Sequence, residues 1–261
     1  CLVGHGISSA PVYNNETGEY VGMLDYRDIV DFVLTVFHKK RMEPITENES
    51  VGISDIVHRA TAGETIPTEA IVVMTQSSLQ AVIEIFSSNL GIHRINVMNS
   101  DGRVQGLLSK TDVVRFLLSK IDVFGEDAKK TLEEAGLGKG PLISVAATAT
   151  VLEALERMSE YSISSIPFIF QHNRFSRLWL TCSNFISLAL SQKGLENAGQ
   201  DSYPVFDVNS SVTVEKVMQK LLATKTHRIW VVNAQAQLEG VLSMTDIIRY
   251  LCKSDQLKVS E

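Results

Sequence analysis

An internal repeat constrains this chain more than any other feature of its sequence. Residues 92–116 (IHRINVMNSDGRVQGLLSKTDVVRF) and residues 226–250 (THRIWVVNAQAQLEGVLSMTDIIRY) align without a gap. A third copy, with one extra turn residue, spans residues 7–33, and a more divergent fourth copy spans residues 163–188. Self-similarity of this kind indicates one supersecondary unit that is copied along the chain and stacked on its neighbours. In chain order, the copies at 7–33, 92–116, 163–188 and 226–250 belong to motifs 1, 2, 3 and 4.

Each copy predicts the same order of secondary structure. In motif 2, apolar side chains at helical spacing predict a helix over residues 79–88, and apolar strands at 94–98 and 104–108 enclose a polar turn. A closing helix is expected to begin at Thr111 and Asp112, since threonine caps helices and aspartate suits the positive end of the dipole. One more strand is expected before the first helix, at Ala70–Met74, Leu142–Val145 and Tyr203–Phe206.

The resulting β-α-β-β-α units place the chain in the α/β (α+β) class. A unit of about 50 residues is too small to bury both faces of its sheet, so the motifs are expected to pair. The glycine-rich stretch within residues 119–139 is the expected boundary between two pairs. The first expected module covers residues 1–125, with motif 1 at 1–38, truncated at its N-terminus, and motif 2 at 70–120. The second covers residues 126–261, with motif 3 at 140–192 and motif 4 at 202–254.

The composition argues against several classes of protein. A net charge of −6 with 44% hydrophobic residues indicates a soluble chain with a buried core and argues against a surface that coats nucleic acid. No apolar run reaches the roughly 20 residues that cross a bilayer, so no membrane partner is expected. The distant cysteines Cys1, Cys182 and Cys252 are expected to be reduced thiols in the cytoplasm or nucleus. No catalytic motif and no metal-ligand spacing is present, so we expect a protein that is not an enzyme.

The repeat resembles CBS motifs, and four of them in tandem resemble two Bateman modules packed as a flat disk. The stretch GISSAPVY at 6–13, the stretch VGML at 21–24 and the two His-Arg pairs are similar to the gamma regulatory subunits of AMP-activated and sucrose non-fermenting protein kinases. This resemblance implies regulatory binding of AMP, ADP or ATP between motifs, with no other cofactor. It also implies a heterotrimer with kinase alpha and beta subunits.

An aspartate recurs at the start of the closing helix in three motifs. Asp28, Asp112 and Asp246 each stand six residues after a glycine of the preceding strand, namely Gly22, Gly106 and Gly240. A carboxylate there can accept hydrogen bonds from two vicinal hydroxyls, and the glycine leaves room for a flat ligand. In CBS proteins generally this aspartate holds the ribose of an adenine nucleotide, which is the role predicted for these three residues. The alternative is that they only stabilise a helix, by about 0.3 to 1 kcal/mol each.

Basic residues recur beside the core strands of motifs 2 and 4. His93–Arg94 and His227–Arg228 occupy equivalent places, and Lys110 directly precedes the closing helix of motif 2. Arginine offers a planar fork to phosphate oxygens, and histidine and lysine add further donors. We therefore predict that these five residues bind phosphate. The alternative is a solvated basic surface.

Motifs 1 and 3 depart from this pattern. Motif 1 has Ser8 where the gamma subunits carry arginine. In motif 3, Leu178 replaces the glycine and Asn184 replaces the aspartate, so its own site is expected to be weak or empty. Gamma subunits typically keep the aspartate in the third motif and have a basic residue in the second, which is the reverse of this chain.

Hydroxyl side chains precede the first helix of motifs 2, 3 and 4. Hydroxyls and unpaired amides at a helix N-terminus can meet phosphate, and the alternative is plain capping. The residues concerned are Thr75, Ser77, Thr148, Thr150 and Ser211.

Three functions are compatible with these patterns. The first is an energy-sensing regulatory subunit of a protein kinase. The second is a CBS regulator or scaffold that works without a kinase, for example by restraining a phosphatase. The third is the detached regulatory region of a transporter or metabolic enzyme.

Overall fold

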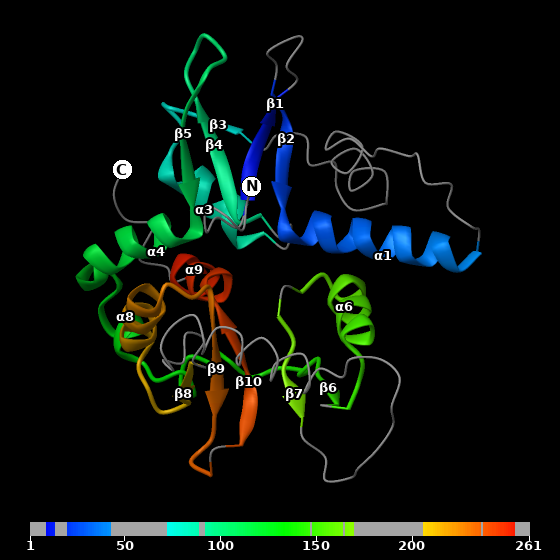
Figure 1. Cartoon of the computed structure of the whole chain (residues 1–261). Helices are drawn as coiled ribbons and strands as arrows, with labels where there is room; N and C mark the ends of the chain where they lie inside the picture. Colours follow the sequence, from blue (N-terminus) through cyan, green and yellow to red (C-terminus); the bar gives the residue numbers. More distant parts are fainter. Residues whose placement is uncertain are drawn as a thin grey trace, which may run out of the picture. The chain divides into compact units, whose positions relative to one another are not determined.

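The computed structural model describes residues 9–13, 20–42, 72–88, 92–146, 148–163, 165–169, 206–235 and 237–253. Helices alternate with small sheets through these ranges, as the repeat predicts (Figure 1). The chain separates into two compact units. One contains residues 1–71 and 143–203 and holds motifs 1 and 3; the other contains residues 72–142 and 204–261 and holds motifs 2 and 4.

The unit with motifs 2 and 4, called the 2/4 unit below, has two three-stranded sheets of the same topology. In each sheet the first strand runs parallel to the central strand, and the third is antiparallel to it. Motif 2 supplies β3 (Val72–Met74), β4 (Arg94–Met98) and β5 (Val104–Ser109). Motif 4 supplies β8 (Asp207–Asn209), β9 (Arg228–Val232) and β10 (Leu238–Ser243). The structure confirms the three strands predicted in motif 2, the first of them over its described residues 72–74. In motif 4, β8 does not include Phe206 of the predicted stretch 203–206, and residues 203–205 lie outside the described ranges.

Four helices of the 2/4 unit pack between its two sheets (Figure 1). They are α3 (Leu79–Ser87), α4 (Lys110–Ser119), α8 (Val214–Thr224) and α9 (Met244–Lys253). Helix α3 packs against α9, and α4 packs against both α8 and α9. Phe86, Ile95, Leu221 and Ile248 are all fully buried in this core. Each such side chain contributes about 1.5 to 3 kcal/mol to stability through burial. Because α3 contacts α9, and α4 contacts α8 and α9, the helices hold the two motifs together.

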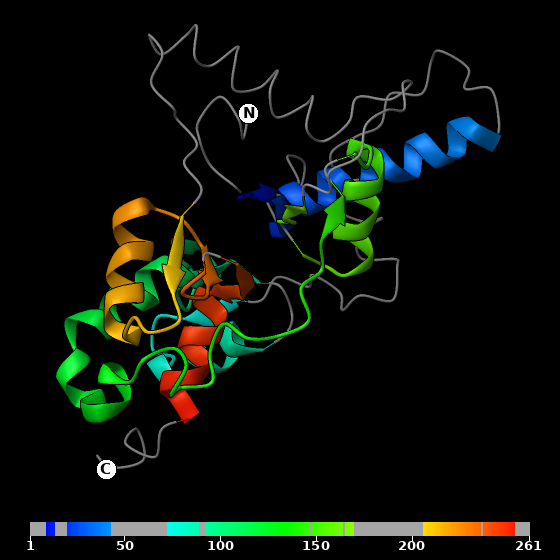
Figure 2. The same ribbon diagram turned by 90° about the horizontal axis from the view of Figure 1, so that it is seen from below.

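Residues 120–142 form an ordered segment of the 2/4 unit. They contain the short helices η2 (Ile121–Phe124) and α5 (Gly125–Lys129), and α5 lies beside α8 (Figure 2). The amide of Leu132 donates to the oxygen of Val212 at 2.9 Å, and Leu132 is fully buried. The stretch expected as a boundary between two pairs of motifs therefore packs on motif 4, which its polar, glycine-rich sequence did not indicate. The division into Bateman modules after residue 125 is a separate matter and stays a prediction.

The unit with motifs 1 and 3 has smaller sheets in its described ranges. The strands β1 (Ser9–Tyr13) and β2 (Tyr20–Asp25) are antiparallel, and β6 (Val145–Ala146) and β7 (Phe168–Ile169) are parallel. Its helices are α1 (Tyr26–Met42) and α6 (Val151–Glu160), which contact each other. Ser159 Oγ on α6 donates to Asp31 Oδ1 on α1 at 2.6 Å, which ties motif 3 to motif 1.

Among the described helices, none combines the length and apolar character that a membrane span requires.

Candidate anion-binding site

The closing helices α4 and α9 start with the same capping box. Ser109 Oγ accepts from the amide of Asp112, and Asp112 Oδ2 accepts in return from the amide and hydroxyl of Ser109 at 3.0 and 2.6 Å. Ser243 and Asp246 repeat this arrangement at α9, with 2.9 and 2.6 Å. The first turn of each helix is thus fixed by a reciprocal serine–aspartate pair. The cap predicted at Thr111 lies instead at Ser109, two residues earlier.

The sheets place the basic pairs beside these helix starts. Arg94 lies opposite Ser109 across β4 and β5, and Arg228 lies opposite Ser243 across β9 and β10. The main chain adds a second link, because the amide of Lys110 donates to the oxygen of His93 at 3.2 Å. The equivalent bond in motif 4 joins Met244 to His227 at 3.0 Å. Each His-Arg pair is therefore held at the N-terminus of its own closing helix.

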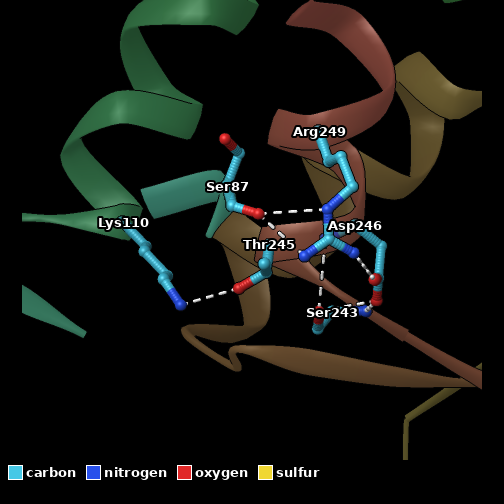
Figure 3. Close-up of polar contacts among 6 residues, drawn as sticks. All are labelled: Ser87, Lys110, Ser243, Thr245, Asp246 and Arg249. Atoms are coloured by element: carbon cyan, nitrogen blue, oxygen red, sulfur yellow. Dashed lines mark hydrogen bonds and ion pairs between the residues drawn. The ribbon is translucent and has the colours of Figure 1, made fainter. Parts of the chain in front are cut away.

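Lys110 reaches from motif 2 to the start of α9 in motif 4. Its side chain is buried, with 6% relative exposure, and its Nζ donates to Thr245 Oγ1 at 2.6 Å (Figure 3). Burial is the main cause that lowers the pKa of Lys110 to about 8, and the positive charge of Arg228 is the second. The negative charge of Asp246 acts in the opposite direction. A buried ammonium bonded to a neutral hydroxyl and close to other cations is expensive unless an anion shares the site.

The two histidines meet where motifs 2 and 4 face each other. The ring centroids of His93 and His227 are 6.4 Å apart. Loss of water around the ring, and then the charges of Arg94, Lys110 and Arg228, lower the pKa of His227. Burial lowers the pKa of Arg228 as well. The His93 ring and the charges of Arg94, Lys110 and Arg228 all lie near His227, so the five predicted phosphate-binding residues are brought together in one place.

The three predicted ribose-binding aspartates all act as helix-start residues. Asp112 and Asp246 use Oδ2 in their capping boxes, and Arg115 donates to Asp112 Oδ1 at 2.9 Å. Burial alone would raise the pKa of Asp112, but bonds from Ser109 and Arg115 lower it overall. The capping role is therefore present in the structure, and carboxylate lone pairs remain for a ligand. Ribose binding stays a prediction.

Asp28 lies in the other unit and differs in its electrostatics. Its Oδ2 accepts from the amide of Asp25 at 2.8 Å. Burial, followed by the charge of Asp25, raises the pKa of Asp28 to about 6. This carboxyl is thus less acidic than an ordinary aspartate, and its pKa shift is opposite to that of Asp112.

The glycines beside the aspartates are not equivalent. A side-chain carbon added at Gly106 would have no atom within 4 Å, so β5 is open there, as predicted. A carbon added at Gly240 would collide with the main-chain oxygen of Gly138 in the 120–142 segment. The space beside Gly240, which was expected to admit a flat ligand, is thus filled by the main chain at Gly138.

The predicted hydroxyls lie at or near helix starts, but most are not the caps. Thr150 caps α6 in a capping box with Glu153. Helix α3 is capped by Ser78 and helix α8 by Thr213. Of the others, Ser77 Oγ accepts from the amide of Met74 at 3.0 Å, the amide of Ser211 donates to Asn209, and Thr75 and Thr148 are exposed. A phosphate role for these residues stays a prediction.

Sequence reasoning missed two residues of the cluster, Thr245 and Arg249. Thr245 accepts from Lys110, and Arg249 joins Asp246 to the end of α3. The repeat contained a signal for each, because Thr111 and Arg115 stand at the equivalent places in motif 2. Ser8, Leu178 and Asn184 lie outside the described residues.

Comparison with known proteins supports the interpretation of the repeat. The model of the CBS domain family matches residues 2–35, 63–119, 137–178 and 201–253. "Protein sds23" of Aspergillus clavatus is 29% identical over 81% of this chain and 46% of its own length. "Protein sds23/moc1" of Schizosaccharomyces pombe is 25% identical over 96% of this chain and 72% of its own length. The chain spans about half the length of several of the curated relatives that it matches.

Solved structures share the fold. A protein of Methanocaldococcus jannaschii, described as a candidate archaeal homologue of g-AMPK, superposes with a TM-score of 0.68 at 15% identity. That comparison covers 95% of this chain and 90% of the archaeal one. An uncharacterised conserved protein of Pyrococcus horikoshii gives a TM-score of 0.54 over 94% of this chain and 91% of its own. The matched segments, the repeated units and the shared architecture agree: the chain is a four-motif protein of the CBS domain family.

Proposed function

We propose that this chain is an adenine-nucleotide-sensing regulatory protein, which binds the phosphates of AMP, ADP or ATP at the basic cluster of the 2/4 unit. The observation that carries the proposal is the buried ammonium of Lys110, hydrogen-bonded to the neutral hydroxyl of Thr245. A phosphate group in this place would offset the repulsion among Lys110, Arg94 and Arg228. It would also supply the charged acceptor that the ammonium lacks in its bond to Thr245.

The chemistry of the cluster suits a phosphate chain better than a neutral ligand. Two guanidinium groups and one ammonium gather with His93 and His227, whose rings are 6.4 Å apart. The cations come from both motifs, so one phosphate chain would be shared between them. A ribose on Asp112 or Asp246 would then stand beside the phosphates, because both carboxylates begin the helices next to the cluster.

Regulation follows from the same geometry. A ligand shared between motifs 2 and 4 links parts of the chain that are distant in sequence, so nucleotides that bind differently favour different arrangements. A coupling of about 1 to 3 kcal/mol changes the affinity for a partner some 5- to 150-fold. We propose that the partner is a kinase alpha–beta pair in the cytoplasm or nucleus. We also propose that the four motifs form two Bateman modules, over residues 1–125 and 126–261.

Calorimetric titration with adenosine, AMP, ADP and ATP tests the binding step. We expect affinity to rise with the number of phosphates, and we expect Arg94→Ala and Arg228→Ala to remove most of that rise. Adenosine affinity should hardly change in either variant. Arg103→Ala is the control, because that side chain is 86% exposed. Equal losses for adenosine and ATP would show that Arg94 and Arg228 support the fold instead.

A second candidate function is a CBS regulator that works without a kinase, such as one that restrains a phosphatase. It is favoured by the curated relatives given above, which carry the name sds23 and not that of a kinase subunit. Pull-down of purified kinase alpha–beta pair and purified phosphatase by the intact chain, with and without ATP, separates the two. Kinase activity that follows the AMP:ATP ratio after reconstitution would support the first candidate. Nucleotide-dependent capture of the phosphatase alone would support the second.

A further inference from the structure

Arg249, in the middle of α9, joins the two motifs. Its Nε and Nη2 both donate to the main-chain oxygen of Ser87, at 3.0 and 2.8 Å, and its Nη1 lies 3.6 Å from Asp246 Oδ1 (Figure 3). Ser87 is the last residue of α3 in motif 2, whereas Arg249 and Asp246 belong to α9 in motif 4. One guanidinium therefore contacts a candidate ribose-binding carboxylate and the end of a helix from the other motif.

The main-chain oxygen of Ser87 is a suitable acceptor for this arginine. The last carbonyl oxygens of a helix have no partner within the helix and carry partial negative charge. Ser88 donates to the oxygens of Glu84 and Ile85, and Arg249 supplies two charge-assisted bonds to Ser87. Charge-assisted hydrogen bonds are stronger than neutral ones, so Arg249 anchors the end of α3.

The end of α3 bears on the phosphate cluster. His93 follows Ser87 by six residues, and Arg94 opens β4 directly after it. The main-chain oxygen of His93 is already held by the amide of Lys110 at 3.2 Å. The closing helix of motif 2 therefore holds His93, and a short stretch of chain tethers the His93–Arg94 pair to the end of α3 that Arg249 contacts.

Motif 2 offers a matched comparison. Arg115 occupies the equivalent place on α4, but within the described residues it donates to Asp112 of its own helix, at 2.9 Å. Its side chain is 63% exposed, against 32% for Arg249. The cross-motif contact is thus a property of one arginine and not of the repeat.

We propose that Arg249 is a positioning residue, which couples a ligand on Asp246 of motif 4 to the His93–Arg94 pair of motif 2 through the end of α3. The proposal rests on nucleotide binding at the cluster. Ribose hydroxyls that donate to the Asp246 carboxylate would compete with the Arg249 guanidinium for it. The attraction between Asp246 and Arg249 would then weaken. The hydrogen bonds from Arg249 to the Ser87 oxygen change as a result. The phosphate-binding pair of motif 2 therefore responds when a nucleotide binds at motif 4.

A double-mutant cycle with the intact chain tests the coupling. ATP and adenosine affinities are measured by calorimetry for Arg249→Gln, Arg94→Ala and the double variant, and a thermal melt of each checks the fold. We expect Arg249→Gln to weaken ATP about tenfold, as the loss of a charge-assisted bond does, and adenosine much less. In the Arg94→Ala background the same change should have little further effect, because contacting residues and coupled networks are non-additive. Arg249→Lys should recover part of the loss, and Arg115→Gln is the control.

The outcomes separate the coupling from the proposed function. Additive losses in the double variant, or equal losses in Arg249→Gln and Arg115→Gln, would overturn the coupling while leaving nucleotide binding in place. Failure of the unaltered chain to bind AMP, ADP or ATP would overturn the proposed function and the coupling with it. An ATP-specific loss that disappears in the Arg94→Ala background supports both.

Discussion

Motifs 2 and 4 share a register and a sheet topology, but they present different side chains to each other. Motif 2 contributes Lys110 to their contact, where motif 4 has Met244, and both side chains are buried. Arg249 of motif 4 crosses to the other motif, whereas Arg115 of motif 2 bonds within its own helix. A duplicated fold has thus become a site whose two halves have different roles.

The comparison shows which features of the repeat are structural and which belong to the site. The serine–aspartate capping box is the same in both halves, down to its bond lengths of 2.6 Å between Ser Oγ and Asp Oδ2. Two positions beside that box differ in what they contact: Lys110 stands where motif 4 has Met244, and Arg249 reaches the other motif whereas Arg115 does not. The capping box fixes the backbone, and the neighbouring positions carry the chemistry.

The largest expected difference concerns the two strand glycines. Gly240→Ala would drive its new carbon into the main-chain oxygen of Gly138, whereas Gly106→Ala has open space. We expect Gly240→Ala to lower the free energy of unfolding by about 3 kcal/mol, since overpacking against backbone is not easily relieved. Urea denaturation followed by circular dichroism measures both variants. Similar midpoints for the two would mean that the 120–142 segment does not press on β10 in solution.

Replacing Lys110 with its counterpart from motif 4 should separate binding from stability. Lys110→Met removes a buried cation, so we expect weaker ATP binding by about tenfold and no loss of folding stability. The exposed Lys120 provides the control variant Lys120→Met. Calorimetry and thermal melts of the same samples give both quantities. A large drop in melting temperature would show that Lys110 is a structural residue.

The lowered pKa of Lys110 predicts two pH dependences of opposite sign. ATP affinity should fall several-fold between pH 7 and pH 9, because Lys110 loses its proton above a pKa of about 8. Stability without ligand should rise with pH between about 8 and 10.5, because the unfolded chain binds more protons over that window. Calorimetry and denaturant titrations across this range measure the two. Both trends should be absent in Lys110→Met, and their persistence there would assign them to another group.

The smallest expected effect tests whether the two capping aspartates differ at all. Asp112→Ala and Asp246→Ala should each cost about 1 kcal/mol of stability, because each removes half of an equivalent capping box. Their effects on ATP affinity need not match. If ribose uses only one of them, that variant alone loses binding beyond the stability effect. If both variants lose a small and equal amount of ATP affinity, then the two aspartates only cap their helices.

Much of the fold was predictable because it depends on local patterns. Alternation and helical spacing placed β4, β5 and α3 within a residue of their observed bounds. The packing of residues 120–142 on motif 4 was not predicted, and the reason is physical. Leu132 is an isolated apolar residue in a polar, glycine-rich stretch, and its amide is held by the oxygen of Val212, eighty residues away. No periodicity reveals a contact of that kind.

The candidate site was predictable only in its conspicuous members. The His-Arg pairs and the aspartates stood out because they recur, and Lys110 because it adjoins them. Thr245 and Arg249 recur as well. Thr111 contacts Met244 Sδ in the other motif, as Thr245 contacts Lys110, whereas Arg115 donates within its own helix and Arg249 donates to the other motif. Duplication indicated that these residues share a position. It gave no information on which copy had acquired a contact to the other motif.

The discontinuity of the 2/4 unit also affects the order in which the protein can form. Its two stretches, 72–142 and 204–261, are separated by the motif 3 part of the other unit. At ribosomal rates of about 5 to 20 residues per second, motif 2 emerges several seconds before motif 4 is complete. During that interval the apolar faces of α3 and α4 and the buried side chains of the 120–142 segment lack their partner. The pairing that later joins the two halves of the site is therefore a late, non-local step, and contacts of this kind slow folding.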